Sequence, residues 1–337
     1  MSGLKTEDIR PHEAEQRYLE LYRQEISALI DPETGMVENR LLSERSCPVC
    51  ESTSSEYQFV KDGFHFVKCK ECHLLYVNPS LRESALKAYY EDSKAIDFFQ
   101  QYILMPTRQV RNQNIFKPRV AFIEQYCSGG RLLDVGCAVG NFLECLKDRP
   151  GWEISGVEPN RGAADFVERE LGIPVAKCLL EETDFPEATF DVITFWETVE
   201  HIQDPIGLLK YCYKLLKKGG VFFVSTPNIA GFEFQVAGKD HFNIAAPNHL
   251  NYFSPETMCR LLNRAGFTEI KITTPGKLDV ENIKILLKQG YGSDIVGSFW
   301  KDIILGDGPV NEKLRTDLQR LIVDNNLSGN MVAVCRK

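Results

Sequence analysis

The chain of 337 residues lacks both a long apolar run and an excess of positive charge. No stretch reaches the roughly 18 apolar residues of a membrane-spanning helix, so we expect no such helix. Asp and Glu number 47 against 39 Lys and Arg, which gives a net charge of −8, and no Lys/Arg-rich cluster occurs. Because a nucleic-acid-binding protein normally presents a basic face, these absences disfavour both a membrane and a nucleic acid as partner.

The first residues also lack the charged leader and apolar core of a signal peptide, since they are polar and acidic. Hydrophobic residues make up 43% and charged residues 26%, which is close to the globular average and excludes a disordered chain. Of the 11 cysteines, seven are scattered singly among apolar residues, as is typical of reduced thiols. We therefore predict a soluble cytoplasmic protein.

Strand and helix patterns alternate from about residue 119 onward. Such alternation predicts an α/β fold, with a parallel sheet and helices on both faces. Two strand patterns, at 266–275 and 330–337, end this domain of residues 119–337. About 50 residues with helical patterns separate them, so we expect a helical insertion at about 276–328. The earlier strand patterns are RLLDVG, WEISGVE, FDVITFW and GGVFFVSTP.

Ahead of this domain, the sequence predicts a helical segment over 1–46, a cysteine-bearing segment over 47–80 and a helical linker over 81–118. Two C-x-x-C pairs, separated by 18 residues, lie in the middle segment. Two such turns supply four thiolates in a tetrahedral arrangement, which is typical of a zinc ribbon. Four thiolates leave no open position, so we predict a structural Zn²⁺ that stabilises a segment too small to bury its own core. The predicted metal ligands are Cys47, Cys50, Cys69 and Cys72.

A glycine-rich turn follows the first strand of the α/β domain, in the pattern D-x-G-x-A-x-G from Asp134 through Gly136 to Gly140. Glycines at such a turn let the backbone approach a ligand at a helix N-terminus. The next strand ends at Glu158, where a carboxylate is placed to accept both hydroxyls of a ribose. The loop differs from the dinucleotide fingerprint G-x-G-x-x-G. The pattern therefore predicts a cofactor that contains adenosine but no pyrophosphate.

Together with FDVITFWETVEHIQDP, GGVFFVSTPN and NHLNYFSPETMCRLLNRAGF, this loop resembles the class I S-adenosylmethionine-dependent methyltransferases. The resemblance implies a Rossmann-like sheet of seven strands, with S-adenosylmethionine as cofactor. It also implies that Asp134, Gly136 and Gly140 line the methionine end and that Glu158 holds the ribose. The chain departs from many relatives at Leu179, where they carry an acid near the adenine. The expected cofactor contacts are Asp134, Gly136, Cys137, Ala138, Gly140, Glu158, Pro159, Leu180 and Trp196.

An E-x-x-E-H group formed by Glu197, Glu200 and His201 follows the fourth strand, at the edge of a parallel sheet where ligands bind. In a helical turn these positions face one way. Such a triad binds a divalent cation, or His201 acts as a general base oriented by a carboxylate. The pattern resembles ubiquinone-biosynthesis O-methyltransferases, where an equivalent group supports a metal-assisted reaction. The alternative is that Glu197 caps a helix while the other two residues pack or bind water.

A long aromatic loop over 227–253 follows the fifth strand and contains His241 and His249. Loops of this length are usually functional, and this one is placed to cover the methyl acceptor. We expect His249 and Tyr252 to be catalytic, because they lie in the block that resembles the family. Trp196 forms a pocket wall or packs in the core. The full catalytic prediction is Glu197, Glu200, His201, His249 and Tyr252.

The cysteine motif before the core and the tail PGKLDVENI…LSGNMVAVCRK resemble methyltransferases encoded with bacterial surface-carbohydrate pathways. This resemblance implies a small-molecule acceptor, a sugar or nucleotide-linked sugar. Because a hydroxyl acceptor must lose its proton, we predict methyl transfer to an oxygen with His201 or His249 as base. The alternatives are C-methylation of a nucleotide sugar, methylation of a protein or RNA docked through the ribbon, and an inactive binding module. The sequence does not indicate an oligomeric state.

Overall fold

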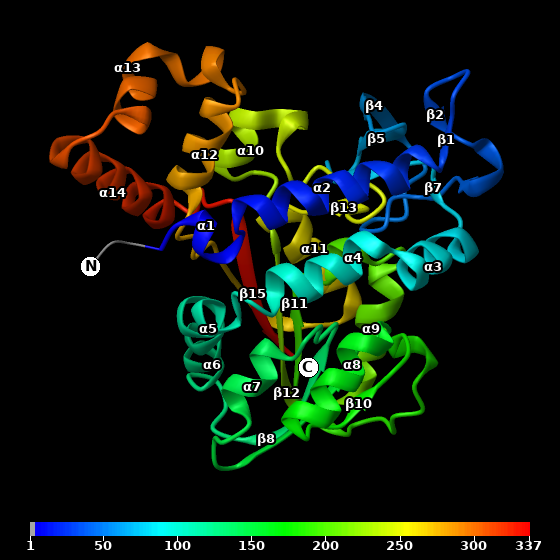
Figure 1. Ribbon diagram of the computed structural model, residues 1–337. Helices are drawn as coiled ribbons and strands as arrows, with labels where there is room; N and C mark the ends of the chain where they lie inside the picture. Colours follow the sequence, from blue (N-terminus) through cyan, green and yellow to red (C-terminus); the bar gives the residue numbers. More distant parts are fainter. Residues whose placement is uncertain (1–3) are drawn as a thin grey trace.

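The computed structural model describes residues 4–337 and contains a central seven-stranded sheet (Figure 1). Its strands are β8 (Gly130–Val135), β9 (Trp152–Val157), β10 (Val175–Ala176), β11 (Phe190–Trp196), β12 (Leu216–Pro227), β14 (Thr268–Thr273) and β15 (Asn330–Arg336). They lie in the order β10-β9-β8-β11-β12-β15-β14, and only the pairs that involve β15 are antiparallel. The predicted Rossmann-like methyltransferase sheet is confirmed.

Helices cover both faces of this sheet because its central strands are apolar on both sides. Neighbouring residues of β8 show this: Leu132 packs with Leu143, whereas Leu133 packs with Leu209 and Leu261 in a separate cluster. The helices of these two layers include α6 (Lys117–Ile123), α7 (Asn141–Leu146), α8 (Arg161–Phe166) with its π-helical extension η4 (Val167–Leu171), α9 (Pro205–Leu215) and α11 (Pro255–Ala265). The 3₁₀ turns η5 (Leu180–Glu182) and η6 (Val199–His201) precede α9.

The cysteine-bearing segment forms part of a second, four-stranded sheet. Its strands are β4 (Ser55–Lys61), β5 (Phe64–Cys69), β6 (Leu75–Val77) and β13 (Asn251–Tyr252). The last of these comes from the aromatic loop after β12, and it pairs antiparallel with β6 through Asn251↔Tyr76 and Tyr252↔Leu75. The loop expected over 227–253 therefore contains a strand, and it also contains α10 (Phe232–Ala237) and the 3₁₀ turn η7 (Gly238–Asp240).

The helices near the N-terminus cross the molecule above the carboxyl edge of the parallel strands (Figure 1). They are α1 (Thr6–Ile9), α2 (His12–Ser27), α3 (Glu83–Asp92), α4 (Lys94–Phe98) and the π-helix η2 (Phe99–Leu104). The next two elements, α5 (Arg108–Arg111) and the π-helix η3 (Asn112–Phe116), lie beside α6 and connect η2 to it (Figure 1). Short pieces connect α2 to the cysteine segment and to α3: β1 (Ile30–Asp31), β2 (Met36–Val37), η1 (Asn39–Leu41), β3 (Leu42–Ser43) and β7 (Ser80–Leu81).

Three further helices fill the stretch for which the sequence predicts an insertion: α12 (Asp279–Lys288), α13 (Ser293–Leu305) and α14 (Pro309–Asp324). They stack beside α10 at one end of the molecule (Figure 1). Along residues 4–337, no helix combines the length and the apolar character needed to cross a membrane.

Candidate active site

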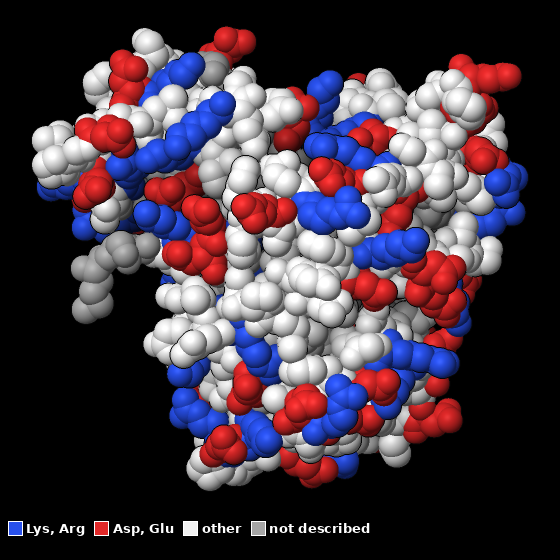
Figure 2. All heavy atoms as spheres, viewed as in Figure 1, with Lys and Arg blue, Asp and Glu red and all other residues white. Residues whose placement is uncertain are grey.

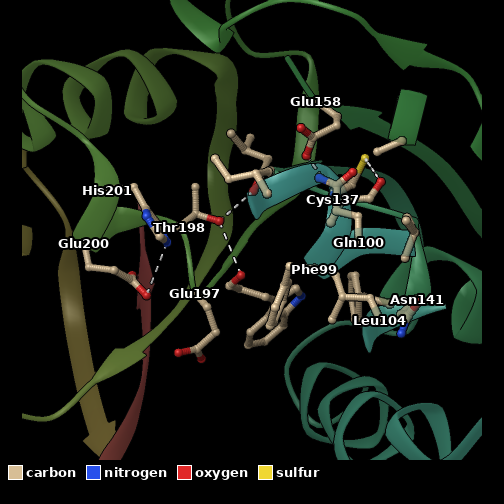
Figure 3. A pocket seen from close by; sticks show the side chains of 18 of the residues that line it. Phe99, Gln100, Leu104, Cys137, Asn141, Glu158, Glu197, Thr198, Glu200 and His201 are labelled. Atoms are coloured by element: carbon tan, nitrogen blue, oxygen red, sulfur yellow. Dashed lines mark hydrogen bonds and ion pairs between the residues drawn. The ribbon is translucent and has the colours of Figure 1, made fainter. Parts of the chain in front are cut away.

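A cleft of about 2250 Å³ lies between the N-terminal helices and the carboxyl ends of β8, β9 and β11. Pockets for one small ligand usually measure about 300–1,000 Å³. The cleft therefore has room for a cofactor and an acceptor side by side. The side chains of α4 and η2, including Phe99, Gln100 and Leu104, face the glycine loop across it (Figure 3).

The glycine loop is held in a left-handed backbone conformation at three positions, with φ of 72° at Gly136, 47° at Ala138 and 73° at Gly140. A Cβ on Gly136 would lie 2.7 Å from Oγ1 of Thr198. A Cβ on Gly140 would lie 2.8 Å from Val167. Gly136 thus borders the cleft as expected. Gly140 is not among the residues that border the cleft; it caps the start of α7 and lets that helix pack against η4.

Two buried carboxyl groups lie at the carboxyl ends of β8 and β9: Asp134 is in β8, and Glu158 directly follows β9. Oδ1 of Asp134 accepts a hydrogen bond from Thr194 at 2.7 Å, and burial raises the pKa of Asp134 to about 7. The Glu158 carboxylate accepts from the backbone N–H groups of Ala138 at 2.8 Å and Asn160 at 2.9 Å. Burial raises the pKa of Glu158 as well. The other expected cofactor contacts that border the cleft are Cys137, Ala138, Pro159, Leu180 and Trp196.

Arg119 is a residue of the cleft that the sequence analysis missed. Its guanidinium donates to Glu197 at 3.1 Å and lies 4.6 Å from the ring centroid of Trp196. The indole Nε1 of Trp196 is buried and has no hydrogen-bond partner among residues 4–337. Burial lowers the pKa of Arg119. No local pattern distinguishes this arginine from the others, so only the fold reveals it.

Glu197 does not converge with Glu200 and His201 (Figure 3). Its backbone has a φ of 54°, so the helical turn begins only with η6 and the three residues do not share one helical face. The Glu197 carboxylate accepts instead from Arg119, from Ser225 at 2.5 Å and from Asn330 at 3.0 Å. The expected i, i+3, i+4 group is therefore replaced by a carboxylate that pairs with Arg119.

The structure places His249, and not Glu197, beside Glu200 and His201. The imidazole rings of His201 and His249 meet edge to face, with centroids 4.8 Å apart. Nδ1 of His201 lies 2.6 Å from the carbonyl of Asn248, and Nδ1 of His249 lies 2.9 Å from that of Asn243. A carbonyl only accepts, so both Nδ1 atoms carry hydrogen and both Nε2 atoms keep a free lone pair.

One oxygen of Glu200 completes this group. Oε2 accepts from Thr226 at 2.9 Å, whereas the buried Oε1 has no hydrogen-bond partner among the described residues and lies 3.9 Å from Nε2 of His201. One ligand atom from each of Glu200, His201 and His249 lies within 4.8 Å of the others. Burial raises the pKa of Glu200 and lowers those of both histidines. The group is therefore driven toward a neutral state.

The two remaining aromatic-loop candidates lie behind this group. The hydroxyl of Tyr252 donates to the carbonyl of His249 at 3.0 Å and accepts from Ala245, and the ring is only 3% exposed. Tyr252 thus holds the loop and does not border the cleft. His241 is buried against Glu233, to which its Nε2 donates at 3.1 Å, and burial lowers its pKa to about 3.

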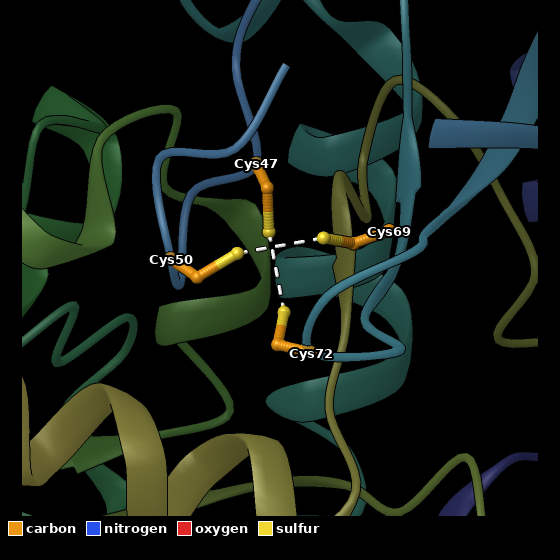
Figure 4. A group of neighbouring side chains, drawn as sticks. All are labelled: Cys47, Cys50, Cys69 and Cys72. Carbon is orange, nitrogen blue, oxygen red and sulfur yellow. Dashed lines mark hydrogen bonds between the residues drawn. The ribbon is translucent and has the colours of Figure 1, made fainter. Parts of the chain in front are cut away.

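The four predicted zinc ligands converge on one point (Figure 4). The Sγ atoms of Cys47 and Cys72 lie 3.4 Å apart, as do those of Cys50 and Cys69, and all four lie within 4.8 Å of one another. His73 follows Cys72 but is exposed and outside the group. Four thiols in this arrangement fit a tetrahedral Zn²⁺.

Comparison with known proteins gives the family. A family model described as a methyltransferase domain matches residues 108–272. A ubiquinone biosynthesis O-methyltransferase of Idiomarina loihiensis is 31% identical over 169 residues, which cover 46% of this chain and 69% of that protein. A probable S-adenosylmethionine-dependent methyltransferase of Mycolicibacterium smegmatis is 26% identical over 200 residues, which cover 59% of this chain and 74% of that protein. Across the curated relatives, the aligned stretch spans between half and three quarters of their length.

Among solved structures, phosphoethanolamine N-methyltransferase 2 of Haemonchus contortus, in complex with S-adenosyl-L-methionine, is similar with a TM-score of 0.50 and 15% identity. The match covers 78% of this chain and 62% of that one, and it bears on the fold alone. The family model carries the assignment further, because it matches the segment that contains the glycine loop, Glu158 and the E-x-x-E-H group. The relative from Idiomarina loihiensis is itself a methyltransferase that the aligned stretch covers to 69%. The chain belongs to the class I S-adenosylmethionine-dependent methyltransferases.

Proposed function

We propose that the protein transfers a methyl group to a hydroxyl oxygen of a small molecule, with His201 as the general base. The observation that carries this proposal is the free Nε2 of His201, which is fixed by the bond from Nδ1 to Asn248 and lies at the cleft beside Glu200. A base must reach the acceptor proton before its pKa matters. His249 shares the free nitrogen and the position in the cleft, and we choose His201 because its Nε2 lies 3.9 Å from the Glu200 carboxyl group.

The cofactor half of the cleft fits S-adenosylmethionine. Glu158 is placed to accept from the ribose hydroxyls, while Arg119 and the unpartnered Nε1 of Trp196 offer donors to a carboxylate. Asp134 and Gly136 border the same cleft, and we assign the methionine end of the cofactor to them. Bound S-adenosylmethionine supplies a methyl group already activated by its sulfonium. The protein's part is then to hold the two reactants in line, with the acceptor oxygen roughly 3–3.5 Å from the methyl carbon.

Proton removal completes the reaction. Nε2 of His201 takes the hydroxyl proton as the acceptor oxygen takes the methyl group, and the sulfonium becomes a neutral thioether. The lowered pKa of His201 keeps the ring neutral, and so able to accept a proton, at physiological pH. Oε1 of Glu200, 3.9 Å from Nε2, is the carboxyl oxygen beside the imidazolium that forms.

A divalent cation is the second candidate for this group. Glu200, His201 and His249 provide three donor atoms, and the Nδ1–H group of each imidazole is bound to a backbone carbonyl, as is usual for histidines that bind metals. A cation held by these three residues would lower the pKa of an acceptor hydroxyl. We propose it in place of the triad expected from the sequence, because Glu197 pairs with Arg119.

The acceptor is proposed as a small hydroxylated molecule. Tyr18, Tyr90, Phe99 and Phe242 line the same cleft as His249, and such rings stack on sugars and aromatic acceptors alike. The two curated relatives reported above give no support to a carbohydrate, since one is named for ubiquinone biosynthesis and the other names no acceptor. A sugar or nucleotide-linked sugar, and C-methylation of it, therefore stay proposals beside a quinone-type hydroxyl.

A nucleic-acid acceptor is not favoured by the surface. Figure 2 shows Lys and Arg interspersed with Asp and Glu on the face that it presents, without a broad basic area. The ribbon also packs its cysteines into the core of the methyltransferase domain. Both observations favour a small molecule over a docked RNA.

Labelling tests the proposal. The protein is incubated with methyl-labelled S-adenosylmethionine and a cell extract freed of macromolecules, and products are identified by mass spectrometry, with NMR to separate O-methyl from C-methyl. We expect an O-methylated small molecule. His201→Ala should lower the rate by roughly 10²–10⁴-fold, whereas the exposed His73→Ala should not. Label found only in macromolecules of an unfiltered extract, or an unimpaired His201→Ala, contradicts the proposal.

A further inference from the structure

Arg45 lies two residues before the first ribbon cysteine and joins three separate segments. Its Nε donates to the carbonyl of Val77 at 3.2 Å, within the ribbon. Its Nη1 donates to the carbonyl of Gln203 at 3.1 Å, just after the E-x-x-E-H turn. Its Nη2 donates to the carbonyl of Leu250 at 3.2 Å and to Oδ1 of Asn251 at 2.5 Å, in the aromatic loop. One guanidinium thus connects the ribbon to both segments that carry the proposed catalytic histidines.

Backbone hydrogen bonds follow the same route. The N–H of Val77 donates to the carbonyl of Leu250 at 3.0 Å, and the N–H of Leu250 donates to the carbonyl of Glu200 at 2.8 Å. Nδ2 of Asn251 donates to the carbonyl of Ile202 at 2.7 Å. Leu250 is therefore bound on one side to the ribbon and on the other to the catalytic turn, directly beside His249.

The ribbon is in turn fixed to the helix that follows β13. Arg264 of α11 donates to the carbonyl of Val49 and pairs with Glu51, in the first cysteine turn. Arg260 of α11 donates to the carbonyl of Glu71 at 3.4 Å, in the second. Both cysteine turns thus accept hydrogen bonds from the same helix, and cysteines of both turns pack in one cluster with residues of that helix.

We propose that the four-cysteine ribbon holds the acceptor half of the active site in place, and that Arg45 is the positioning residue through which it does so. The proposal rests on the proposed function, since it concerns the placement of His201 and His249. A strand of two residues such as β13 makes few bonds of its own, so its position depends on β6 and Arg45. None of the contacts described for Arg45 reaches the glycine loop, so the cofactor half is independent of it.

Hydrogen–deuterium exchange on the full-length, zinc-loaded protein tests this without an acceptor. In Arg45→Gln, amides of residues 199–203 and 248–252 should exchange about ten- to a hundredfold faster, because the three hydrogen bonds from Arg45 to these segments are lost or replaced. Amides of residues 130–142, the zinc content and the affinity for S-adenosylmethionine should stay the same. Arg45→Lys keeps the charge but not the planar fork, so it should give an intermediate change. The control is Arg40→Gln, which removes an exposed arginine paired only with Glu38.

Asn251→Ala provides a second variant if Arg45→Gln does not fold, since it removes the bonds to Arg45 and Ile202 from the other side. It should give the same regional pattern, as should removal of zinc from the wild-type protein. Once an acceptor is identified, Arg45→Gln should raise the KM for that acceptor and leave the affinity for the cofactor unchanged. Exchange that is unchanged, or that rises equally in residues 130–142, overturns the proposal. Exchange does not measure catalysis. If His201 is not the general base, the activity assay of His201→Ala shows it, and this experiment is unaffected.

Discussion

At the scale of single residues, the free nitrogen of His201 results from a hydrogen bond to a backbone carbonyl, which no motif encodes. The pattern E-x-x-E-H identifies His201 and Glu200 as candidates, but it cannot show that the positive φ of Glu197 turns that carboxylate toward Arg119. His249 lies 48 positions after His201 in the chain and joins the group only through the folding of the aromatic loop. The residue types were therefore predictable from the sequence, and their grouping was not.

The titration of His201 is a prediction at this scale. Burial lowers its pKa, so we expect the ring to take up a proton at a pH below the ordinary value of about 6.5. The unfolded chain binds that proton first as the pH falls, so this group also costs stability below about pH 6.5. NMR titration of the imidazole Cε1–H resonances, assigned with His201→Ala, measures the midpoint. A midpoint at or above 6.5 would contradict the buried, neutral base.

Glu158 gives a second prediction, for cofactor binding. Glu158→Ala removes the acceptor proposed for the ribose hydroxyls, so S-adenosylmethionine should bind more weakly by roughly 1–3 kcal/mol in calorimetry. The variant should also lose some stability, because Ala138 and Asn160 each lose a hydrogen-bond acceptor. Glu153→Ala is the matched control, since this exposed residue lies on β9, the strand that ends just before Glu158. Equal affinity in both variants would remove Glu158 from the cofactor site.

At the scale of elements, local patterns predicted the central sheet because its strands are continuous apolar runs that alternate with helices. They did not predict β13, which has two residues and therefore no periodicity. Its partner Tyr76 lies 175 positions before Asn251, so the pairing is a property of the tertiary structure. For the same reason, the segment over 47–80 reads as a separate ribbon in sequence but shares a sheet with the aromatic loop.

The ribbon itself carries a prediction at the element scale. Purified protein should contain about one tightly bound zinc per chain, and Cys72→Ser should release it and lower the melting temperature, because the metal supplies folding free energy to this segment. Cys259→Ser, which changes a cysteine outside the cluster, is the control and should keep the zinc. Elemental analysis and a thermal scan measure both effects. Protein purified without chelator that contains no zinc, with all four thiols freely titratable, would refute the site.

At the scale of the whole molecule, the cleft proposed to bind the cofactor is assembled from two parts of the chain, since α3, α4 and η2 lie over the carboxyl edge of the central sheet (Figures 1 and 3). Two polar contacts span the mouth: Lys87 with Glu182 at 3.2 Å, and Asp97 with Asn160 at 2.9 Å. Both are exposed, and exposed contacts of this kind contribute little stability. We therefore expect these helices to move away from the sheet when the cofactor enters.

Asp97→Ala tests this arrangement, because Asp97 binds the side chain of Asn160, whose backbone N–H donates to Glu158. Loss of one hydrogen bond across the mouth should speed the release of S-adenosylmethionine by about two- to tenfold, while the melting temperature of the cofactor-free protein stays nearly unchanged. Stopped-flow displacement measures the release rate, and Asp92→Ala, an exposed acid on α3, is the control. Bound cofactor should slow hydrogen exchange over residues 83–104 in the wild type and less so in Asp97→Ala. If cofactor binding leaves exchange in that segment unchanged, the helices do not close on the cofactor, and the cleft is rigid.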